Sequence, residues 1–335
     1  MKETRSVISA CLACALFSFY GTDIRSKAVT GTQDWTRVEL VFESGANDVL
    51  SLNCLFGGWG KATGTAWFDD VELELLSGRA LKPQVTVEAT KTLAPLSKYI
   101  YGQFIEHLGR CIYQGVWAEM LEDRKFFYAV NTPDSVWKSS GEPHSVWMNP
   151  VVAYVGVHAV EVRLKGNGRP GGISQGDLAI IERKSYAGRI VLSADPGALP
   201  IEVSLVWGDG VEDRQAVSID DIGNDYRTFP VSFTAGASTE NARLEIWSRG
   251  GESFRVGAVS LMPADNIEGF RPEVLALLKE LDSPVYRWPG GNFVSGYNWK
   301  DGIGDPDRRP PRKNPAWLGI EHNDVGVHEY LDLMR

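Results

Sequence analysis

Cysteine is scarce in this sequence, and its scarcity excludes two kinds of site. Four cysteines occur among 335 residues. Cys11 and Cys14 lie in an apolar N-terminal segment, and the other two, Cys54 and Cys111, are far apart. We therefore expect no disulfide framework and no cysteine-based metal site. The five histidines also lack the spacing of zinc ligands, so a metal centre is not expected.

Long apolar runs and an excess of positive charge are missing as well. No segment approaches the roughly 20 apolar residues of a membrane-spanning helix, so we expect no membrane partner. Lysine and arginine total 34 against 43 aspartates and glutamates, a formal net charge of −9. Such a surface would repel the phosphates of nucleic acid. No glycine-rich phosphate motif is present, because the glycines at 166–172 are typical of turns.

Hydrophobic and aromatic residues are plentiful instead. Hydrophobic residues make up 43% of the chain, which includes 11 tryptophans and 11 tyrosines. A chain of this length accommodates two or three domains. Most of the aromatic side chains are expected in their cores, which leaves a minority for a binding surface.

Residues 1–30 are interpreted as a leader or signal-like segment. Two basic residues precede an apolar run at 7–19, and Ala13-Cys14-Ala15 has the small-x-small form of a cleavage site. An acidic residue at position 3, and small residues inside the run, argue against a signal peptide. A secreted or periplasmic location, if the segment is a signal peptide, and a cytoplasmic location otherwise both stay open. So does a reading frame that starts inside a domain.

Two segments of the sequence resemble each other, at 34–76 and 225–262. Each opens on an aspartate, an aromatic residue and an arginine–threonine pair, and each continues through alternating β patterns of similar order. We interpret them as the closing strands of two related β-sandwich modules, a partial one at 31–80 and a complete one at 131–263. In the alternative, residues 1–33 supply a substitute strand for the first module.

The pattern changes on either side of the second module. The predicted elements are a short buried strand, a helix, a second strand and a second helix, at 99–105, 271–282, 285–288 and from Val327. The apolar faces expected for the two helices are Val274, Leu277, Leu278 and Leu281, then Val327, Tyr330, Leu331 and Met334. This alternation predicts a parallel α/β sheet. We expect the start of a (β/α)8 TIM barrel at 83–130, continued at 264–335, with the sandwich inserted.

Residues 285–299 (VYRWPGGNFVSGYNW) are the most informative stretch of the chain. Proline removes a backbone donor and the glycines allow unusual conformations, so the strand ends there with Arg287 and Asn292 on either side of the turn. Aromatic rings beside hydrogen-bonding groups suit a sugar. Barrel enzymes place their chemistry at the C-terminal ends of strands, a position that Glu106 also occupies.

Four motifs in this order resemble α-L-arabinofuranosidases of glycoside hydrolase family 51. They are YGQFIEHLGR at 101–110, RWPGGNF at 287–293, WKDGIG at 299–304 and EHNDVG at 321–326. The resemblance implies a catalytic (β/α)8 barrel and removal of terminal arabinofuranosyl groups, with retention of configuration. The expected partner is an arabinose-containing polysaccharide or oligosaccharide, such as arabinan or arabinoxylan. No cofactor is implied, and a homo-oligomeric full-length protein stays open. The sandwich pattern resembles galactose-binding-like carbohydrate-binding modules, with a structural spacer as the other interpretation.

The same resemblance implies roles for four residues. Glu106, Arg287 and Asn292 match positions that hydrogen-bond the arabinofuranose in the −1 subsite, and Trp317 matches the aromatic beside the sugar. A retaining glycosidase also needs two carboxyl groups about 5 Å apart. The family's acid/base glutamate follows an asparagine on a later strand, and no such pair occurs near a strand end here. The catalytic glutamates are therefore expected beyond Arg335, and the chain is expected to be an inactive fragment.

Three features leave alternatives open. Glu321 is either a local hydrogen-bonding group or part of the site, and His107 either touches the site or is structural. The charged, proline-rich stretch at 305–313 is expected to be a solvated loop at the site mouth. The alternative function is a non-catalytic carbohydrate-binding protein built on the sandwiches.

Overall fold

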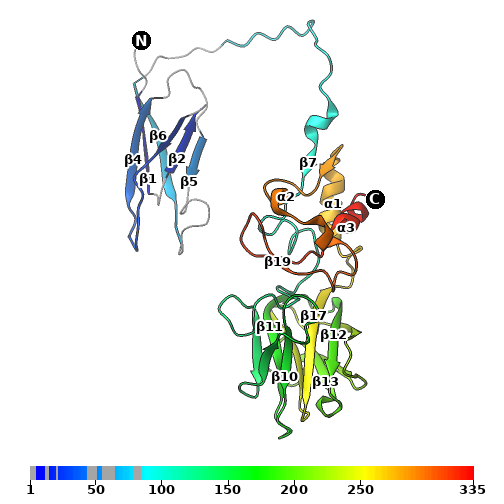
Figure 1. Cartoon of the computed structure of the whole chain (residues 1–335). Coiled ribbons are helices and arrows are strands. Elements are labelled where there is room, and N and C mark those ends of the chain that lie inside the picture. Colours follow the sequence, from blue (N-terminus) through cyan, green and yellow to red (C-terminus); the bar gives the residue numbers. More distant parts are fainter. Residues whose placement is uncertain (1–4, 12–14, 20–21, 44–50, 55–64, 78–83) are drawn as a thin grey trace. The chain divides into compact units, whose positions relative to one another are not determined.

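The computed structural model describes residues 5–11, 15–19, 22–43, 51–54, 65–77 and 84–335. The chain divides into two compact units, Met1–Ala94 and Pro95–Arg335, which are described separately (Figure 1). Within the described residues, no helix combines the length and apolarity required to cross a bilayer.

The first unit consists of two three-stranded antiparallel sheets. In one sheet, β1 (Arg5–Cys11) lies between β4 (Arg37–Glu43) and β6 (Asp69–Ser77). In the other, β2 (Ala15–Phe19) lies between β3 (Thr22–Arg25) and β5 (Ser51–Cys54). The segment in which we expected a leader thus contains three of the six strands. Its first four residues and positions 12–14, which include the first two residues of the expected cleavage motif, lie outside the described residues.

The second unit contains a β-sandwich of two five-stranded antiparallel sheets between Trp137 and Pro263. The first sheet has the order β15-β12-β17-β10-β9, with strands at Arg227–Thr234, Ser185–Ala194, Ser253–Pro263, Ala159–Arg163 and Val146–Asn149. The second has the order β14-β13-β16-β11-β8, with strands at Arg214–Ile219, Ile201–Val206, Thr239–Ser248, Gly171–Ile180 and Trp137–Gly141. The complete sandwich expected from the sequence is therefore present.

The repeat detected in the sequence is confirmed by the strand pairing. In the first unit the orders are β4-β1-β6 and β3-β2-β5, and in the sandwich the last six strands have the orders β15-β12-β17 and β14-β13-β16. Strand for strand, β1–β6 correspond to β12–β17. The structure therefore follows the alternative in which residues before Asp34 supply strands. Counterparts of β8–β11 do not occur among the described residues of the first unit.

The sandwich core extends beyond the sandwich strands. It is formed by side chains such as Ile190, Leu192 and Phe254, each with no exposed surface. Leu121 and Phe126 belong to the same cluster, although the sequence places them in the barrel segment at 83–130. These apolar residues are buried against the sandwich, so the connection between the two parts is a packed one rather than a linker.

The prediction of a strand at 99–105 is wrong for the first half of that segment. Lys98–Tyr101 forms a 3-10 helix, whose start is capped by the Ser97 hydroxyl, and only Gln103–Phe104 (β7) is extended. The segment is also exposed rather than buried, with Phe104 56% accessible. A capping serine and a following Gly102 favour a short helical turn over a continuous strand.

Two further expectations hold around the Pro-Gly-Gly turn. The helix at 271–282 is observed as α1 (Pro272–Leu281), and the strand at 285–288 is observed as β18 (Tyr286–Arg287). β18 pairs in parallel with β7, which sets Arg287 opposite Phe104. A parallel pair with a helix before its second strand is compatible with an α/β sheet, and the start of a (β/α)8 barrel stays a prediction. The remaining short elements are η2 (Pro196–Ala198), α2 (Phe293–Gly296), η3 (Trp299–Gly302), β19 (Arg312–Lys313), β20 (Ile320–Glu321) and α3 (Val327–Leu333).

The buried faces of the helices differ from those expected. In α1, Val274, Leu275 and Leu278 pack against a cluster around Ile105, Trp117 and Phe270, whereas Leu277 and Leu281 are exposed. In α3, the packed residues are Tyr330 and Leu333, and Leu331 and Met334 are exposed. Spacing predicted one wide apolar face, but each helix meets the described chain on only part of that face.

Candidate functional site

The proposed sugar-binding glutamate, Glu106, lies just after β7 and is almost buried, with 9% of its surface exposed. Its Oε1 accepts hydrogen bonds from the Phe293 backbone N–H at 3.0 Å and from the Trp317 indole N–H at 2.7 Å. The structure therefore brings Glu106 and Trp317 into direct contact, although they are 211 positions apart. Two donors to one oxygen hold the carboxylate in a single orientation.

The Pro-Gly-Gly turn is shaped by the Glu106 carboxylate. Gly291 has φ +59°, and a Cβ at this position would lie 1.7 Å from Glu106 Oε2. The neighbouring Gly290 is similarly close to the Phe104 ring, at 2.3 Å. Only glycine leaves room for the carboxylate against the turn backbone, which explains the two glycines physically.

Arg287 and Asn292 lie in the segments beside this carboxylate. Both are exposed, and the Arg287 guanidinium carbon lies 5.1 Å from the centroid of the Phe104 ring. The Arg287 carbonyl accepts a hydrogen bond from Ile105 N–H at 3.0 Å, which places the residue next to Glu106 in the sheet. Neither side chain has a hydrogen-bond partner within the described part of the chain. Their roles toward a sugar stay predictions.

His107, next to Glu106, is held in one tautomer. Its Nε2 receives a hydrogen bond from the Trp288 indole N–H at 2.8 Å, and its Nδ1 lies 2.6 Å from Glu321 Oε2. An indole nitrogen can only donate, so Nε2 must carry the lone pair and Nδ1 the proton. The imidazole is therefore neutral and donates to Glu321. The ring also stacks on Phe293, with centroids 4.3 Å apart.

Glu321 is fully engaged by hydrogen-bond donors. Besides His107, its carboxylate accepts from the Tyr113 hydroxyl and from the Asn323 backbone N–H, the latter at 2.7 Å, and only 1% of the residue is exposed. Burial, followed by the charge of Glu321, holds the pKa of Tyr113 well above its ordinary value. The sequence left Glu321 between two roles, and its contacts are those of a hydrogen-bonded structural group.

Trp317 is presented by a short hairpin formed by β19 and β20. At the tip, the Asn314 side-chain oxygen accepts from the backbone N–H of Ala316 and of Trp317, at 3.0 and 2.8 Å. The Asn314 amide group in turn donates to the carbonyl of His107 at 2.9 Å. One asparagine thus ties the tip of the hairpin to the strand end that carries Glu106.

Comparisons with known proteins bear on this same region. The family described as "Alpha-L-arabinofuranosidase 1 domain" matches residues 277–335. The intracellular exo-α-(1→5)-L-arabinofuranosidase 1 of Bacillus subtilis (strain 168) is 51% identical over 69 residues, which is 21% of this chain and 14% of that protein. The C-terminal segment is similar to α-L-arabinofuranosidases. A probable α-L-arabinofuranosidase C of Aspergillus terreus is 52% identical over 69 residues, again 14% of its length.

The chain therefore spans about a seventh of the length of these curated arabinofuranosidases. Among solved structures, a CBM61 module in complex with β-1,4-galactotriose is 14% identical with a TM-score of 0.32, covering 43% of this chain and 98% of that one. A CBM22-1 xylan-binding domain is 12% identical with a TM-score of 0.34, covering 45% and 98%. The matched segment, 277–335, contains Arg287, Asn292 and Trp317, whereas Glu106 lies outside it and contacts Trp317.

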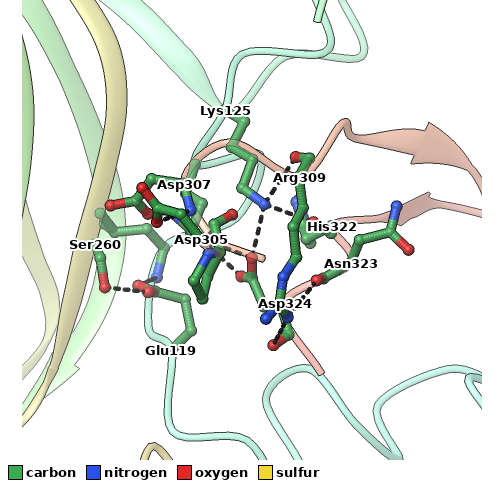
Figure 2. A network of polar contacts seen from close by, with 12 residues as sticks. Glu119, Lys125, Ser260, Asp305, Asp307, Arg309, His322, Asn323 and Asp324 are labelled. Atoms are coloured by element: carbon green, nitrogen blue, oxygen red, sulfur yellow. Dashed lines mark hydrogen bonds and ion pairs between the residues drawn. The ribbon is translucent and has the colours of Figure 1, made fainter. Parts of the chain in front are cut away.

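The base of the hairpin formed by β19 and β20 is held by buried charges that the sequence did not indicate. Arg124 donates to both oxygens of Asp324, at 2.6 and 2.5 Å, and to Asp307 at 2.7 Å. Lys125 donates to Asp324 at 2.8 Å and to the carbonyls of His322 and Arg309 (Figure 2). All four ionised side chains are at most 5% exposed.

The prediction that the loop at 305–313 is solvated is therefore wrong for its middle residues, since Asp307 and Arg309 are buried. Asp307 pairs with Arg124 from the segment before the sandwich, and Arg309 pairs with Glu329. The one signal in the sequence was Arg124-Lys125, two adjacent cations between the acidic residues at 122–123 and the aromatic residues Phe126 and Phe127. Adjacent cations in such a stretch are buried only with carboxylate partners.

This charge network shifts the pKa values of its members. Burial alone would raise the pKa of Asp324, but Arg124 and Lys125 outweigh it and hold that pKa well below its ordinary value. Burial lowers the pKa of Lys125 to about 8 and that of His322 to about 4. His322 is therefore neutral at pH 7. Within the described residues, no cluster of three or more histidine, cysteine, aspartate or glutamate side chains could hold a metal ion.

Proposed function

We propose that the second unit carries the sugar pocket of an α-L-arabinofuranosidase-type glycoside hydrolase. The pocket would hold a terminal arabinofuranosyl group of arabinan, arabinoxylan or a related oligosaccharide. The observation that supports this most is the direct contact of Glu106 with Trp317, beside the Pro-Gly-Gly turn, at the end of a strand.

Each of the four residues has a chemical role in this proposal. Glu106 has one oxygen engaged by protein donors, and the other can accept from a sugar hydroxyl. The Trp317 ring offers an apolar surface to the sugar's C–H face. Arg287 and Asn292 contribute exposed donors that have no described partner, so they can bond ring hydroxyls without first breaking a protein contact.

The parent reaction would be acid-assisted departure of the aglycone with attack by a carboxylate, then hydrolysis of the glycosyl-enzyme. It needs two carboxyl groups about 5 Å apart and no metal or organic cofactor. Glu321 is buried and saturated with donors, so it is not available as a nucleophile or acid. We infer that residues 1–335 bind the sugar without hydrolysing its bond, and no catalytic role is assigned within them.

The proposal is tested by calorimetric titration of the 335-residue protein with 1,4-dideoxy-1,4-imino-L-arabinitol, an iminosugar shaped like arabinofuranose. Binding by the wild type and at least tenfold weaker binding by Glu106→Gln are expected, because a charged acceptor is lost. The matched control is Glu212→Gln, an exposed glutamate of the sandwich. Equal affinity of Glu106→Gln and wild type would refute the pocket.

Two further measurements separate the alternatives. Release of a nitrophenol from an aryl arabinofuranoside by the pure protein would contradict binding without turnover. Retention on insoluble arabinoxylan that survives Glu106→Gln would instead favour a non-catalytic carbohydrate-binding protein built on the sandwiches.

A further inference from the structure

We propose that the inserted sandwich positions Trp317 against Glu106, and that Arg189 is the positioning residue through which it does so. The inference rests on the proposed function, since it concerns the geometry of the same sugar pocket. It gives the sandwich a role in shaping that pocket, separate from any carbohydrate that the sandwich binds itself.

The hairpin that carries Trp317 is held at its tip, where Asn314 donates to the His107 carbonyl, and also at its base. Its two strands have two residues each and form two cross-strand pairs, Arg312 with Glu321 and Lys313 with Ile320. Two such short strands do not form a stable hairpin by themselves. The position of the tip therefore depends on the Asn314 contact together with what holds the two ends of the segment, near Asp307 and Asp324.

The first end is held jointly by the pre-sandwich segment and by the sandwich. Arg189 donates from Nε to Asp307 Oδ2 at 2.6 Å and from Nη2 to Oδ1 at 2.8 Å. Arg124 donates to the same Oδ1 at 2.7 Å. Asp307 is only 4% exposed. The paired contact of Arg189 fixes both the distance and the orientation of this carboxylate.

Arg189 itself stands on a rigid support. It lies in β12, which is a central strand flanked by β15 and β17. The adjacent Ile190 is fully buried in the sandwich core. Arg189 also donates to the Ser260 hydroxyl at 3.4 Å, and Ser260 donates to the buried Glu119 at 2.6 Å (Figure 2). The strand thus sets where Asp307 lies, because neither end of this contact can move freely.

A second contact joins the sandwich to the same end of the hairpin. The Arg308 guanidinium carbon lies 3.7 Å from the ring centroid of Tyr154, and its Nη1 donates to the Tyr154 carbonyl at 3.0 Å. Two adjacent residues of the hairpin base, Asp307 and Arg308, are therefore both tied to the sandwich. At the second end of the hairpin, the carboxylate of Asp324 accepts hydrogen bonds from Arg124 and Lys125, neither of which lies in the sandwich.

Loss of the Arg189 side chain is expected to displace the hairpin tip that carries Trp317. Asp307 would keep Arg124 but lose its paired partner, and the base of the hairpin could shift. Trp317 contacts the pocket carboxylate through one indole hydrogen bond, which a displacement of about 1 Å disrupts. The expected consequence is a folded protein in which Trp317 is no longer held in one position against Glu106.

The experiment compares Arg189→Met and Arg189→Lys with the control Arg214→Met. Arg214 lies in the same sandwich, pairs with Glu245 and has a side chain 32% exposed, against 36% for Arg189. One readout is hydrogen exchange of the Trp317 indole N–H, identified through Trp317→Phe. The other is affinity for the arabinofuranose-shaped iminosugar.

Arg189→Met is expected to speed the exchange of this indole N–H and to weaken the affinity about five- to tenfold, the lower range of couplings between separate sites. Arg189→Lys should recover part of both, and Arg214→Met should leave both unchanged. Unaltered exchange and affinity in Arg189→Met would overturn the proposal. If that variant does not fold, Arg308→Ala, at an exposed position, must show the same direction of change or the proposal fails.

The two proposals fail in different ways. If the wild-type protein does not bind the iminosugar, the proposed function fails, and the exchange of the Trp317 indole N–H still decides whether Arg189 positions it. If the wild type binds but the Arg189 variants match it in both readouts, the positioning role fails and the pocket stands.

Discussion

Trp288 donates its indole N–H to Nε2 of His107 across 2.8 Å. This one hydrogen bond decides the protonation pattern of the residue next to Glu106. Since Nε2 accepts, Nδ1 carries the proton and donates to Glu321. What looks like an ion pair between His107 and Glu321 is therefore a hydrogen bond from a neutral ring to a carboxylate. Three donors surround this carboxylate.

The tautomer of His107 is the first prediction. Nitrogen NMR of the protein at pH 7 should show a protonated Nδ1 and an unprotonated Nε2 for this ring. In Trp288→Phe the donor is missing, so the preference should weaken and a mixed signal should appear. The opposite tautomer in the wild type would contradict the hydrogen-bond assignment. Trp147→Phe, a change in the sandwich, serves as the control.

The second prediction concerns Gly291. Its replacement by alanine introduces a Cβ that meets Glu106 Oε2 at 1.7 Å, in a residue with φ +59°. Gly109→Ala is the matched control, because φ there is +52° and nothing lies within 4 Å. Both should lose about 1 kcal/mol for the left-handed backbone. Only Gly291→Ala should also lose binding of the iminosugar, and equal binding by both variants would argue against this packing.

The buried charge network gives the third prediction. Arg124→Met leaves Asp307 and Asp324 without their shared partner, and removal of one member of a buried pair costs roughly 3–5 kcal/mol. Arg335→Met removes an exposed pair with Asp332, where the arginine side chain is 80% exposed, and should cost less than about 1 kcal/mol. The measurement is the free energy of unfolding in urea. A small effect of Arg124→Met would show that the network contributes little to stability.

The fourth prediction is a pH dependence carried by His322. Its pKa is lowered by burial from 6.5 to about 4, so the unfolded chain takes up the proton first as the pH falls. The stability present above pH 6.5 is therefore lost progressively toward pH 4, by roughly 3 kcal/mol at about 1.4 kcal/mol per pKa unit. The free energy of unfolding at several pH values measures this.

His322→Gln should flatten that part of the curve, and the exposed His328→Gln should not. Asp123 acts in the opposite sense, because burial raises its pKa to about 7 and its contribution is lost as the pH rises through that value. Asp123 is present in all three proteins, so its contribution cancels when the curves are subtracted. A difference curve without a slope between pH 6.5 and 4 would contradict the role of His322.

Local patterns predicted much of the fold because they are set by short-range physics. The alternation of apolar residues identified strands of the two repeated segments such as β4 and β15, and the helix at 271–282 was found from a proline near its start and from its apolar spacing. The internal repeat was visible for the same reason, since related strands keep related patterns. The apolar run at 7–19 was ambiguous, because a signal segment and a buried strand share the same composition.

Long-range partners could not be predicted in this way. The stretch at 305–313 is charged and proline-rich, which favours a solvated loop. Its local sequence does not reveal that Asp307 is buried in contact with Arg124 and Arg189. The same limit applies to the helix faces, since spacing does not reveal how much of an apolar face finds a neighbour. His107 could not be assigned because its state depends on Trp288, 181 positions away.

By itself, the order of residues determined the strand-rich character of the chain, the repeat, and the four motifs that resemble arabinofuranosidases. These features depend on composition and on contacts between near neighbours. Only the tertiary structure decided that Glu106 meets Trp317, that His107 is neutral, and that the sandwich is tied to the hairpin through Asp307. Each of these depends on two side chains brought within about 3 Å from distant parts of the chain, a distance that sequence spacing does not encode.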